Sequence, residues 1–234
     1  MDNKDFFRFK QFTVKHDRCA MKVGTDGVLL GSWASVEGAR TALDVGCGCG
    51  LIALMLAQRN SALHIIGIDI DEEAAEQARE NIAENNRNDQ ISIACADFRT
   101  FSSESKFDLI ISNPPFYKES TTCAYESRNN ARHMSSLPIE RLMERASALL
   151  SDRGLISVIV PYTVAGETIG EASMQGLFLS RRTDIKTTPA KPPKRTLLEF
   201  CKQANPTTTQ VLTLRDAEGN MSAEYKRLTH DFYL

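Results

Sequence analysis

The feature that most restricts the fold of this chain is a glycine-rich turn between an apolar strand and an apolar helix. Residues 41–45 (TALDV) read as a short strand, residues 46–50 (GCGCG) as the turn, and residues 51–57 (LIALMLA) as the start of a helix. Glycines let a ligand approach bare backbone, with the amino end of the helix behind it. The arrangement favours a nucleotide-like ligand, although the loop alone is a weak signal.

Acidic residues end three successive strands of the predicted sheet. Residues 63–68 are nearly all apolar, as is typical of a central parallel strand, and end in Asp69. Asp69 lies about 20 residues past the glycines, where a ribose-binding acid is expected. The strand 91–96 ends in Asp97, and Asp44 lies near the end of the first strand. We therefore expect the three acids at one edge of a parallel sheet.

A fourth apolar strand, which includes residues 110–112, stops at Asn113, followed by Pro114 and Pro115. Neither proline can donate a hydrogen bond, and the residue before each is pushed out of helical geometry, so a stiff turn is expected. The turn directs the Asn113 amide, the Pro114 carbonyl and the Phe116 ring out of the carboxyl end of the strand, where open α/β sheets hold their ligands. Two acceptors beside an aromatic face suit a planar group that carries an NH2, such as a purine amine.

Taken together, these motifs resemble the class I S-adenosylmethionine methyltransferases, and Asn-Pro-Pro-Phe at 113–116 resembles their amine-methylating branch. A hydride-transfer Rossmann domain would usually show G-x-G-x-x-G, whereas Leu51 follows the last glycine here. Residues 6–12, 21–33 and 231–234 resemble the bacterial family that methylates N6 of the adenosine 3′ to the anticodon of tRNA(Val). The resemblance runs from end to end of the chain.

The resemblance implies an α/β fold: a doubly wound, seven-stranded, mostly parallel sheet of the class I (Rossmann-like) methyltransferase type. It also implies S-adenosyl-L-methionine as cofactor, with Asp69 on its ribose, Asp97 and Phe98 on its adenine, and Asp44 toward its methionine end. The implied cofactor-binding residues are Lys22, Thr25, Asp44, Gly46, Gly48, Gly50, Asp69, Ile70, Asp97, Phe98 and Asn113.

The catalytic residues expected from the motif are Asn113, Pro114, Pro115 and Phe116. The lone pair of an exocyclic adenine amine is delocalised into the ring, so the nitrogen is a poor nucleophile. Acceptance of its two hydrogens by the Asn113 oxygen and the Pro114 carbonyl would make it more electron-rich and favour the positive charge of the transition state. Phe116, with Tyr117, would stack on the base. No metal is expected.

Length and charge limit the domain count and the kind of RNA surface. The chain has 234 residues, 42% of them hydrophobic, which suits one domain, 1–234, with a cap segment at 1–40 and a cofactor-binding core at 41–234. The formal net charge is −2, so an RNA surface must be a local patch. The start lacks the apolar region of a signal peptide, and no later run is long enough to span a membrane. We expect a cytoplasmic, monomeric protein that binds neither DNA nor membrane.

The six cysteines fit neither a zinc-binding spacing nor the framework of a short secreted protein, so we expect reduced thiols. Cys47 and Cys49 are interpreted as structural. Further along the chain we expect helices at 71–86 and 137–150, a strand at 154–160, and strands in the tail at 177–216.

Three basic segments are candidates for contact with RNA. The opening segment mixes aromatic and basic residues, and Phe9 is either a core residue or a ring that stacks on a base. The polar stretch 118–135 and the Pro- and Lys-rich connection 186–195 offer cations for phosphate groups. The substrate-binding residues expected from these segments and the motif are Phe9, Tyr117, Arg128, Arg132, His133, Lys191, Lys194 and Arg195.

Three alternatives stay open at the level of the sequence. Asn-Pro-Pro-aromatic also serves methylation of a glutamine side-chain amide in release factors, but those enzymes resemble each other in a longer helical amino-terminal domain that 40 residues cannot supply. Methylation of guanine N2 in ribosomal RNA is harder to exclude. A catalytically silent RNA-binding module would keep the fold and lose site residues, yet no site residue is missing here.

Overall fold

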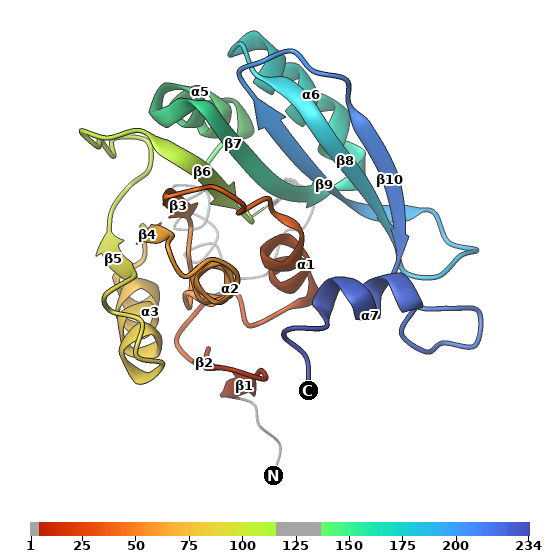
Figure 1. The fold of residues 1–234 in the computed structure, drawn as a ribbon, viewed down its shortest axis with the longest axis horizontal. Helices are drawn as coiled ribbons and strands as arrows, with labels where there is room; N and C mark the ends of the chain where they lie inside the picture. Colours follow the sequence, from red (N-terminus) through yellow and green to blue (C-terminus); the bar gives the residue numbers. More distant parts are fainter. Residues whose placement is uncertain (1–4, 116–136) are drawn as a thin grey trace, which may run out of the picture.

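The computed structural model describes residues 5–115 and 137–234. Within them, eight strands form one sheet in the order β10-β8-β9-β7-β6-β3-β4-β5 (Figure 1). All neighbours pair in parallel except β9, which is antiparallel to both β7 and β8. The strands are β3 (Thr41–Val45), β4 (His64–Asp69), β5 (Ile91–Cys95), β6 (Phe107–Ser112), β7 (Leu150–Pro161), β8 (Phe178–Lys186), β9 (Pro193–Cys201) and β10 (Thr208–Thr213).

The predicted α/β class with a mostly parallel sheet is confirmed, but the expected number of seven strands is one too few for the described residues. The additional strand is β10, which extends the edge of the sheet by pairing in parallel with β8. Five of its six residues are polar or exposed, and Leu212 is the residue of β10 that is buried. A strand covered so little by the core leaves almost no hydrophobic pattern in the sequence.

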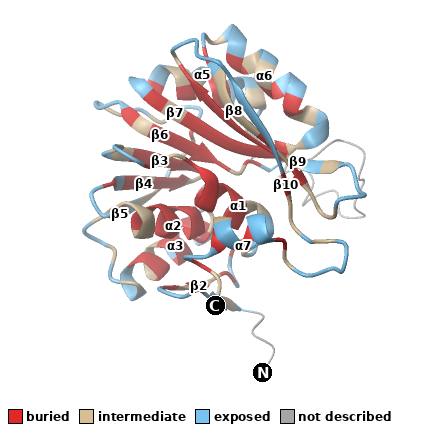
Figure 2. Ribbon diagram, turned by 45° about the vertical axis from the view of Figure 1, so that its right-hand side comes forward, coloured by how far each residue is buried: buried red, intermediate tan, exposed pale blue. Residues whose placement is uncertain are grey.

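Helices cover both faces of the sheet, as a doubly wound fold requires. On β3, Ala42 belongs to one hydrophobic cluster and the next residue, Leu43, to the other, because successive side chains of a strand point to opposite faces. Figure 2 shows that the middle strands are buried almost throughout. One face carries α5 (Ile139–Leu149) and α6 (Ala165–Met174); the other carries α1 (Thr25–Trp33), α2 (Leu51–Arg59), α3 (Glu72–Glu84) and α7 (Ala223–Thr229).

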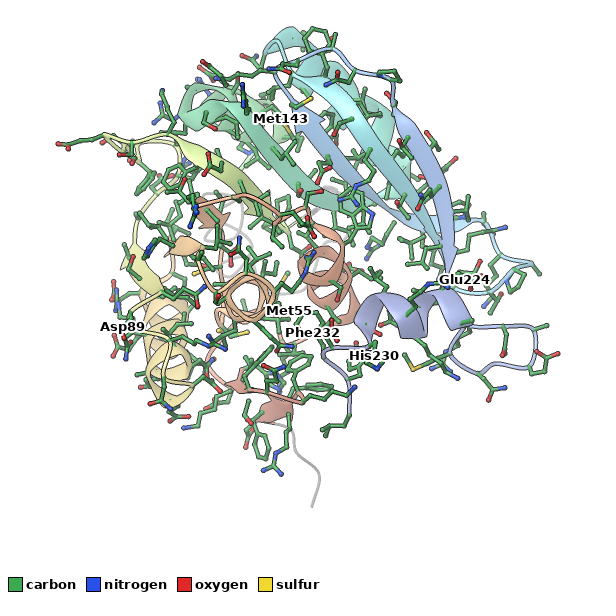
Figure 3. All side chains as sticks on the ribbon, in the orientation of Figure 1. Met55, Asp89, Met143, Glu224, His230 and Phe232 are labelled. Carbon is green, nitrogen blue, oxygen red and sulfur yellow. The ribbon has the colours of Figure 1, made fainter. Side chains whose placement is uncertain are left out.

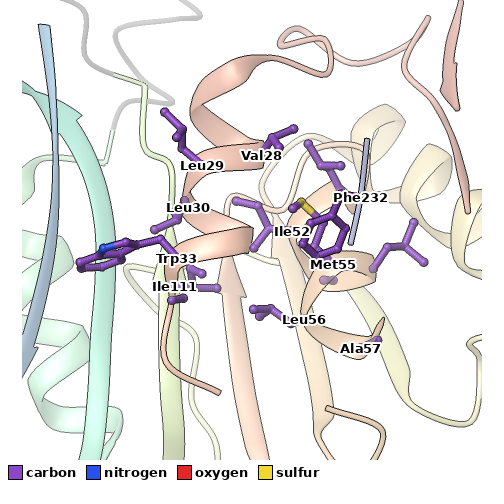
Figure 4. Packing of buried hydrophobic residues seen from close by; sticks show 14 of the residues in the cluster. Val28, Leu29, Leu30, Trp33, Ile52, Met55, Leu56, Ala57, Ile111 and Phe232 are labelled. Atoms are coloured by element: carbon purple, nitrogen blue, oxygen red, sulfur yellow. The ribbon is translucent and has the colours of Figure 1, made fainter. Parts of the chain in front are cut away.

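The helix α1 lies close against α2, which begins directly after the glycine-rich turn. Gly31 permits this approach, since a Cβ at its position would lie 2.7 Å from Met55 Sδ. In Figure 4, the Met55 side chain also lies beside the Phe232 ring, which comes from the carboxyl-terminal end of the chain. The packing holds the turn 46–50 and the start of α1 in fixed positions relative to each other.

Two asparagines, one in α3 and one at its C-cap, hold a short amino-terminal hairpin, β1 (Phe6–Arg8) and β2 (Thr13–Lys15). The Asn81 amide accepts a hydrogen bond from Lys15 N (2.9 Å) and donates to Lys15 O (2.8 Å) and Cys49 O (2.9 Å). Asn85 makes the corresponding pair of bonds with Thr13 N (3.0 Å) and Thr13 O (2.8 Å). One buried amide therefore ties the hairpin to α3 and to the glycine-rich turn.

The aromatic residues in the loop of this hairpin pack into the core. The Phe9 ring lies 4.7 Å from the rings of Phe7 and Phe12 and 6.1 Å from that of Tyr233, measured between centroids. Only 2% of Phe9 is exposed. The structure supports the interpretation of Phe9 as a core residue. The expectation that Phe9 stacks on a base is wrong, because neither face of its ring is free. In Figure 3, Phe232 and His230 lie on the side of the molecule that carries the amino-terminal hairpin.

The helices expected at 71–86 and 137–150 are present as α3 and α5, and the expected strand 154–160 lies within β7. Asp71 accepts a hydrogen bond from Glu73 N and so caps the amino end of α3. Among the helices of the described residues, none combines the length and the apolar character needed to cross a bilayer.

We expect Asn81→Ala to lower the free energy of unfolding by about 2 to 4 kcal/mol, because Lys15 N, Lys15 O and Cys49 O would lose their partner in a buried setting. Urea denaturation measures the change. Asn88→Ala, at an exposed position beyond the same helix, is the matched control and should leave stability unchanged. Equal stability of both variants would show that the asparagine does not hold the hairpin.

Candidate functional site

A cavity of about 960 Å³ opens at the carboxyl ends of β3, β4, β5 and β6. The parallel pairing of β3 with β6 sets Val45 opposite Ser112, and the Ser112 hydroxyl donates a hydrogen bond to Val45 O (2.8 Å). The turn 46–50 and Asn113 therefore follow the ends of two adjacent strands and lie side by side. The predicted site residues that line the cavity are Lys22, Thr25, Gly46, Gly48, Asp69, Ile70, Asp97, Phe98, Asn113, Pro114 and Pro115.

The glycines of the turn have the conformation that only glycine adopts easily. Gly46, Gly48 and Gly50 have φ of 71°, 53° and 79°. A Cβ at Gly46 or Gly48 would meet no atom within 4 Å, so their backbone faces open space, and both line the cavity. Gly50 differs: it is the N-cap of α2 and faces Ala78 of α3, so it shapes the turn from behind.

Asp69 joins the end of β4 to the glycine-rich turn. One carboxylate oxygen accepts a hydrogen bond from Gly48 N (2.8 Å) and the other from Asp71 N (3.0 Å). Burial raises the pKa of Asp69, while the N–H groups of Asp71 and Gly48 oppose that rise. Each oxygen keeps a second acceptor position, so a carboxylate oriented in this way can bind two neighbouring hydroxyl groups.

Asp97 and Phe98 follow β5 at the next position along the edge. The Asp97 carboxylate accepts hydrogen bonds from Arg99 Nε (2.8 and 2.9 Å) and Arg99 N (2.9 Å), and the Arg99 side chain lowers the pKa of Asp97. Phe98 is buried with the cluster under α5 and α6, although it also lines the cavity. Arg99 lines the cavity as well, and its position two residues past the acid is the signal that could have identified it.

Asp44 is fully buried in β3 and is not part of the cavity lining. Neither of its carboxylate oxygens has a hydrogen-bond partner among the described residues; the Ala53 N–H acts on it electrostatically without meeting hydrogen-bond geometry. Burial raises the pKa of Asp44 to about 7, with a further contribution from the charge of Asp69. An acid buried in this way, two residues before the glycine-rich turn, retains acceptor capacity for a polar group brought by a ligand or water.

The basic connection between β8 and β9 lies at the same edge of the sheet, since β8 ends and β9 begins there. Lys191 and Lys194 are exposed on it. Arg195 is instead engaged: its Nε donates to Asp26 Oδ2 (2.7 Å), and Asp26 lines the cavity on α1. Lys191, Lys194 and Arg195 do not line the cavity, and the ion pair of Arg195 was not expected from the sequence.

The remaining predicted residues are Phe116, Tyr117, Arg128, Arg132 and His133, and they lie outside the described residues. Their roles stay predictions. No group of three or more His, Cys, Asp or Glu side chains that could hold a metal ion occurs in the described ranges 5–115 and 137–234.

Solved structures share this fold at low sequence identity. A crystal structure titled "a predicted O-methyltransferase", from Agrobacterium tumefaciens, has a TM-score of 0.68 at 20% identity and covers 88% of this chain and 96% of that one. A ribosomal protein L11 methylase from Lactobacillus delbrueckii subsp. bulgaricus has a TM-score of 0.56 at 18% identity, over 76% of this chain and 77% of that one.

Sequence comparison reaches much closer relatives. Residues 24–183 match the family model described as methyltransferase small domain. A tRNA1(Val) (adenine(37)-N6)-methyltransferase of Bacteroides fragilis (strain YCH46) is 46% identical over 235 residues, 99% of each chain. The protein of the same name from Phocaeicola vulgatus is 47% identical over 229 residues, 98% of this chain and 97% of its own. The chain therefore belongs to the methyltransferase small domain family and, within it, to the tRNA1(Val) adenine-N6 methyltransferase family.

Proposed function

We propose that this protein transfers a methyl group from S-adenosyl-L-methionine to the exocyclic N6 of an adenosine in the anticodon loop of tRNA(Val), next to the anticodon. The observation that carries the proposal is the position of Asn113: it leaves β6 beside the glycine-rich turn and lines the same cavity as Asp69. Relatives with the printed name tRNA1(Val) (adenine(37)-N6)-methyltransferase, 46% and 47% identical over nearly the whole chain, support the substrate.

The cavity suits the cofactor in volume and in the chemistry of its lining. Bare backbone at Gly46 and Gly48 leaves room for a ligand, and Asp69 has free acceptor positions for ribose hydroxyls. In this proposal, the cavity-lining Asp97 and Phe98 contact the adenine, Lys22 and Thr25 contact the methionine end, and the buried Asp44 acts from behind the turn. When bound, the cofactor supplies an electrophilic methyl group on a sulfonium sulfur.

The chain's own contribution to the reaction is to orient the amine and to stabilise developing charge. In this proposal, Asn113 Oδ1 and the Pro114 carbonyl accept the two hydrogens of the adenine amine, which turns the nitrogen lone pair toward the methyl group. The two acceptors bind more strongly as the nitrogen becomes positive, so they stabilise the transition state more than the ground state. Pro115 keeps the turn stiff, and Phe116 and Tyr117 are proposed to stack on the base.

The names of the relatives also rank the alternatives. They favour adenine over guanine N2 and over a glutamine amide as the methylated group. The target base must leave its stack to reach the cavity, which requires less free energy in an anticodon loop than in a duplex. We further propose that residues 1–234 act as one domain, in the cytoplasm, as a monomer that binds tRNA and not DNA or membrane.

Contact with RNA is assigned to the exposed lysines of the connection between β8 and β9. Lys191 and Lys194 lie at the edge of the sheet that carries the cavity, and the acidic side chains of α3 lie at the far side of the fold. Because Arg195 is paired with Asp26, its charge is partly compensated, and we propose that it holds the cavity-lining Asp26 rather than a phosphate group.

For Asn113→Ala we expect single-turnover methyl transfer at saturating tRNA to fall by about 100-fold or more, since an acceptor for the developing positive charge is lost. Cofactor affinity, measured by calorimetry, should stay within about threefold of wild type, because this contact matters most in the transition state. Wild-type turnover in the variant would exclude the proposed role of Asn113.

Asp69→Ala should weaken cofactor binding by on the order of 100-fold or more, because two hydrogen bonds to a charged acceptor, each about 1.5 to 3 kcal/mol, are lost. Titration calorimetry measures this directly. Asp89→Ala, which removes the same charge at an exposed position labelled in Figure 3, is the control and should bind like wild type. If the two variants bind equally well, Asp69 does not hold the ribose.

Replacing Lys191 and Lys194 together by alanine should weaken tRNA binding and make its salt dependence shallower, by about 0.7 to 0.9 in logarithmic slope per lost phosphate contact. Cofactor affinity should be unchanged. A matched pair, Lys106→Ala with Lys202→Ala, removes two charges at the opposite edge of the sheet. Identical salt slopes for the two double variants would place the RNA surface elsewhere.

A further inference from the structure

An exposed aromatic residue lies at the edge of the sheet that carries the cavity, and the site described above gives it no role. Within the described residues, the exposed aromatic side chains are Phe7, Tyr162 and Phe178. Phe7 belongs to the amino-terminal hairpin, and Phe178 begins β8 at the opposite edge of the sheet. Tyr162 directly follows Pro161, the last residue of β7, so it is the one of the three beside the carboxyl ends of the parallel strands.

The register of the sheet brings Tyr162 close to Asn113. The strand β7 is the neighbour of β6, and its Val158 pairs with Ser112, the last residue of β6. From Val158, β7 continues to Pro161, about 10 Å beyond the level at which β6 ends. Tyr162 then begins the short helix η1 (Tyr162–Val164) and does not line the cavity. Its ring therefore lies outside the cavity, beside the strand end that leads to Asn113.

A chain of contacts from β9 and β8 fixes a guanidinium group next to this ring. Thr196 Oγ1 donates a hydrogen bond to Asp184 Oδ1 (2.9 Å), and Arg182 Nε donates to the same oxygen (3.0 Å). The guanidinium carbon of Arg182 lies over the Tyr162 ring, 5.7 Å from its centroid, within the range of a cation–π interaction. Arg182 thus holds the ring from one side, while 39% of Tyr162 stays exposed.

Arg182 keeps most of its donors for a ligand. Within residues 5–115 and 137–234, its hydrogen bond is made by Nε alone, so the four N–H groups of the two Nη atoms are left without an acceptor. A quarter of the side chain is exposed. Paired N–H groups of a guanidinium match two oxygens of a phosphate group, which makes phosphate the ligand that suits Arg182 best.

The ring and the guanidinium lie on the same face of the sheet as one wall of the cavity. Arg182 pairs with Leu198, whose side chain belongs to the cluster under α5 and α6, and the cavity-lining Leu137 packs against that cluster. On the edge strand β10, Val211 pairs with Asp184 and is 60% exposed on this face. An aromatic ring, a guanidinium and an exposed apolar side chain together form a surface of the kind that binds single-stranded RNA.

We propose that Tyr162 and Arg182 bind the RNA strand next to the target adenosine: the Tyr162 ring stacks on a neighbouring base, and Arg182 donates hydrogen bonds to a phosphate group. The inference rests on the proposed function and adds the residues that hold the loop while one base is taken out of it. When the target base leaves its stack to reach Asn113, the base beside it loses a stacking partner. Tyr162 replaces that partner with an aromatic ring held in place by the sheet.

The test of the stacking role measures the affinity of the full chain for an unmodified tRNA(Val) transcript at several salt concentrations. Tyr162→Ala should weaken binding by about 5- to 150-fold, the range for loss of one contact between a base and an aromatic ring, with an unchanged salt slope. Tyr162→Phe keeps the ring and should bind like wild type. Phe178→Ala, which removes an exposed ring at the opposite edge of the sheet, is the matched control and should also bind like wild type.

The test of the phosphate contact uses Arg182→Gln, which should weaken binding and make the salt dependence shallower by about 0.7 to 0.9 in logarithmic slope. Arg153→Gln, at an exposed position near the start of β7, removes the same charge at the opposite edge and is the control. Cofactor affinity, measured by calorimetry, should equal that of wild type in every variant, since none of the replaced residues lines the cavity. The same titration shows that each variant is folded.

Wild-type tRNA affinity in Tyr162→Ala would overturn the proposal and favour a protein partner for this surface. A loss of affinity that Tyr162→Phe does not restore would also overturn it, because the ring would then have no part in binding. Equal salt slopes for Arg182→Gln and Arg153→Gln would exclude the phosphate contact. A wrong functional assignment is recognised separately, as a wild-type chain that neither binds nor methylates the transcript.

Discussion

The parallel pairing of β3 with β6 is the constraint on which the candidate site depends. Asp44 lies opposite Ile111 and Val45 opposite Ser112, so the two strands end at the same level, and the glycine-rich turn and Asn113 follow them next to each other. A shift of this register by one residue would turn every side chain of one strand to the opposite face. Ala42, Leu43, Leu109 and Ile110 make such a shift costly, because each is fully buried on the face that it now occupies.

The charge of the cavity and that of its surroundings suit different ligands. Asp69 and Asp97 line the cavity, and Asp44 lies beneath it, which favours a cationic ligand such as a sulfonium. The exposed lysines of the connection between β8 and β9 lie outside it. A chain with a net charge of −2 can in this way bind a cation and a polyanion at one edge of the sheet.

Much of the fold and part of the site could be predicted because they depend on short sequence patterns of neighbouring residues. The turn 46–50, Asp69, Asp97 and the end of β6 at Asn113 all follow from apolar runs and the residues that stop them, and the structure brings them to one cavity. Other features depend on partners far along the chain. The Arg195–Asp26 pair joins residues 169 apart, one at the start of β9 and one on α1, and no local signal in the sequence indicates it.

Partners far along the chain also explain why the RNA-binding interpretation of Phe9 was wrong. An aromatic residue among cations has the composition of an RNA-binding surface, but Phe9 is buried by Phe12 and Tyr233, which come from both ends of the chain. No local pattern indicated the role of Asn81 and Asn85, since their partners on β2 lie 66 and 72 residues away. Burial of this kind is decided by tertiary packing between distant residues, so it cannot be predicted from a short stretch of the sequence.

The contact between the two ends of the described chain bears on how the molecule is made. Lys10 N donates to Phe232 O (2.8 Å), and Lys10 Nζ donates to His230 O (2.5 Å), across a separation of about 220 residues. During synthesis, the hairpin leaves the ribosome before its aromatic partners, which follow it by more than 200 residues in the chain. Until Phe232 and Tyr233 are added, Phe9 and Phe12 lack their cover and expose apolar surface on the nascent chain, which favours aggregation.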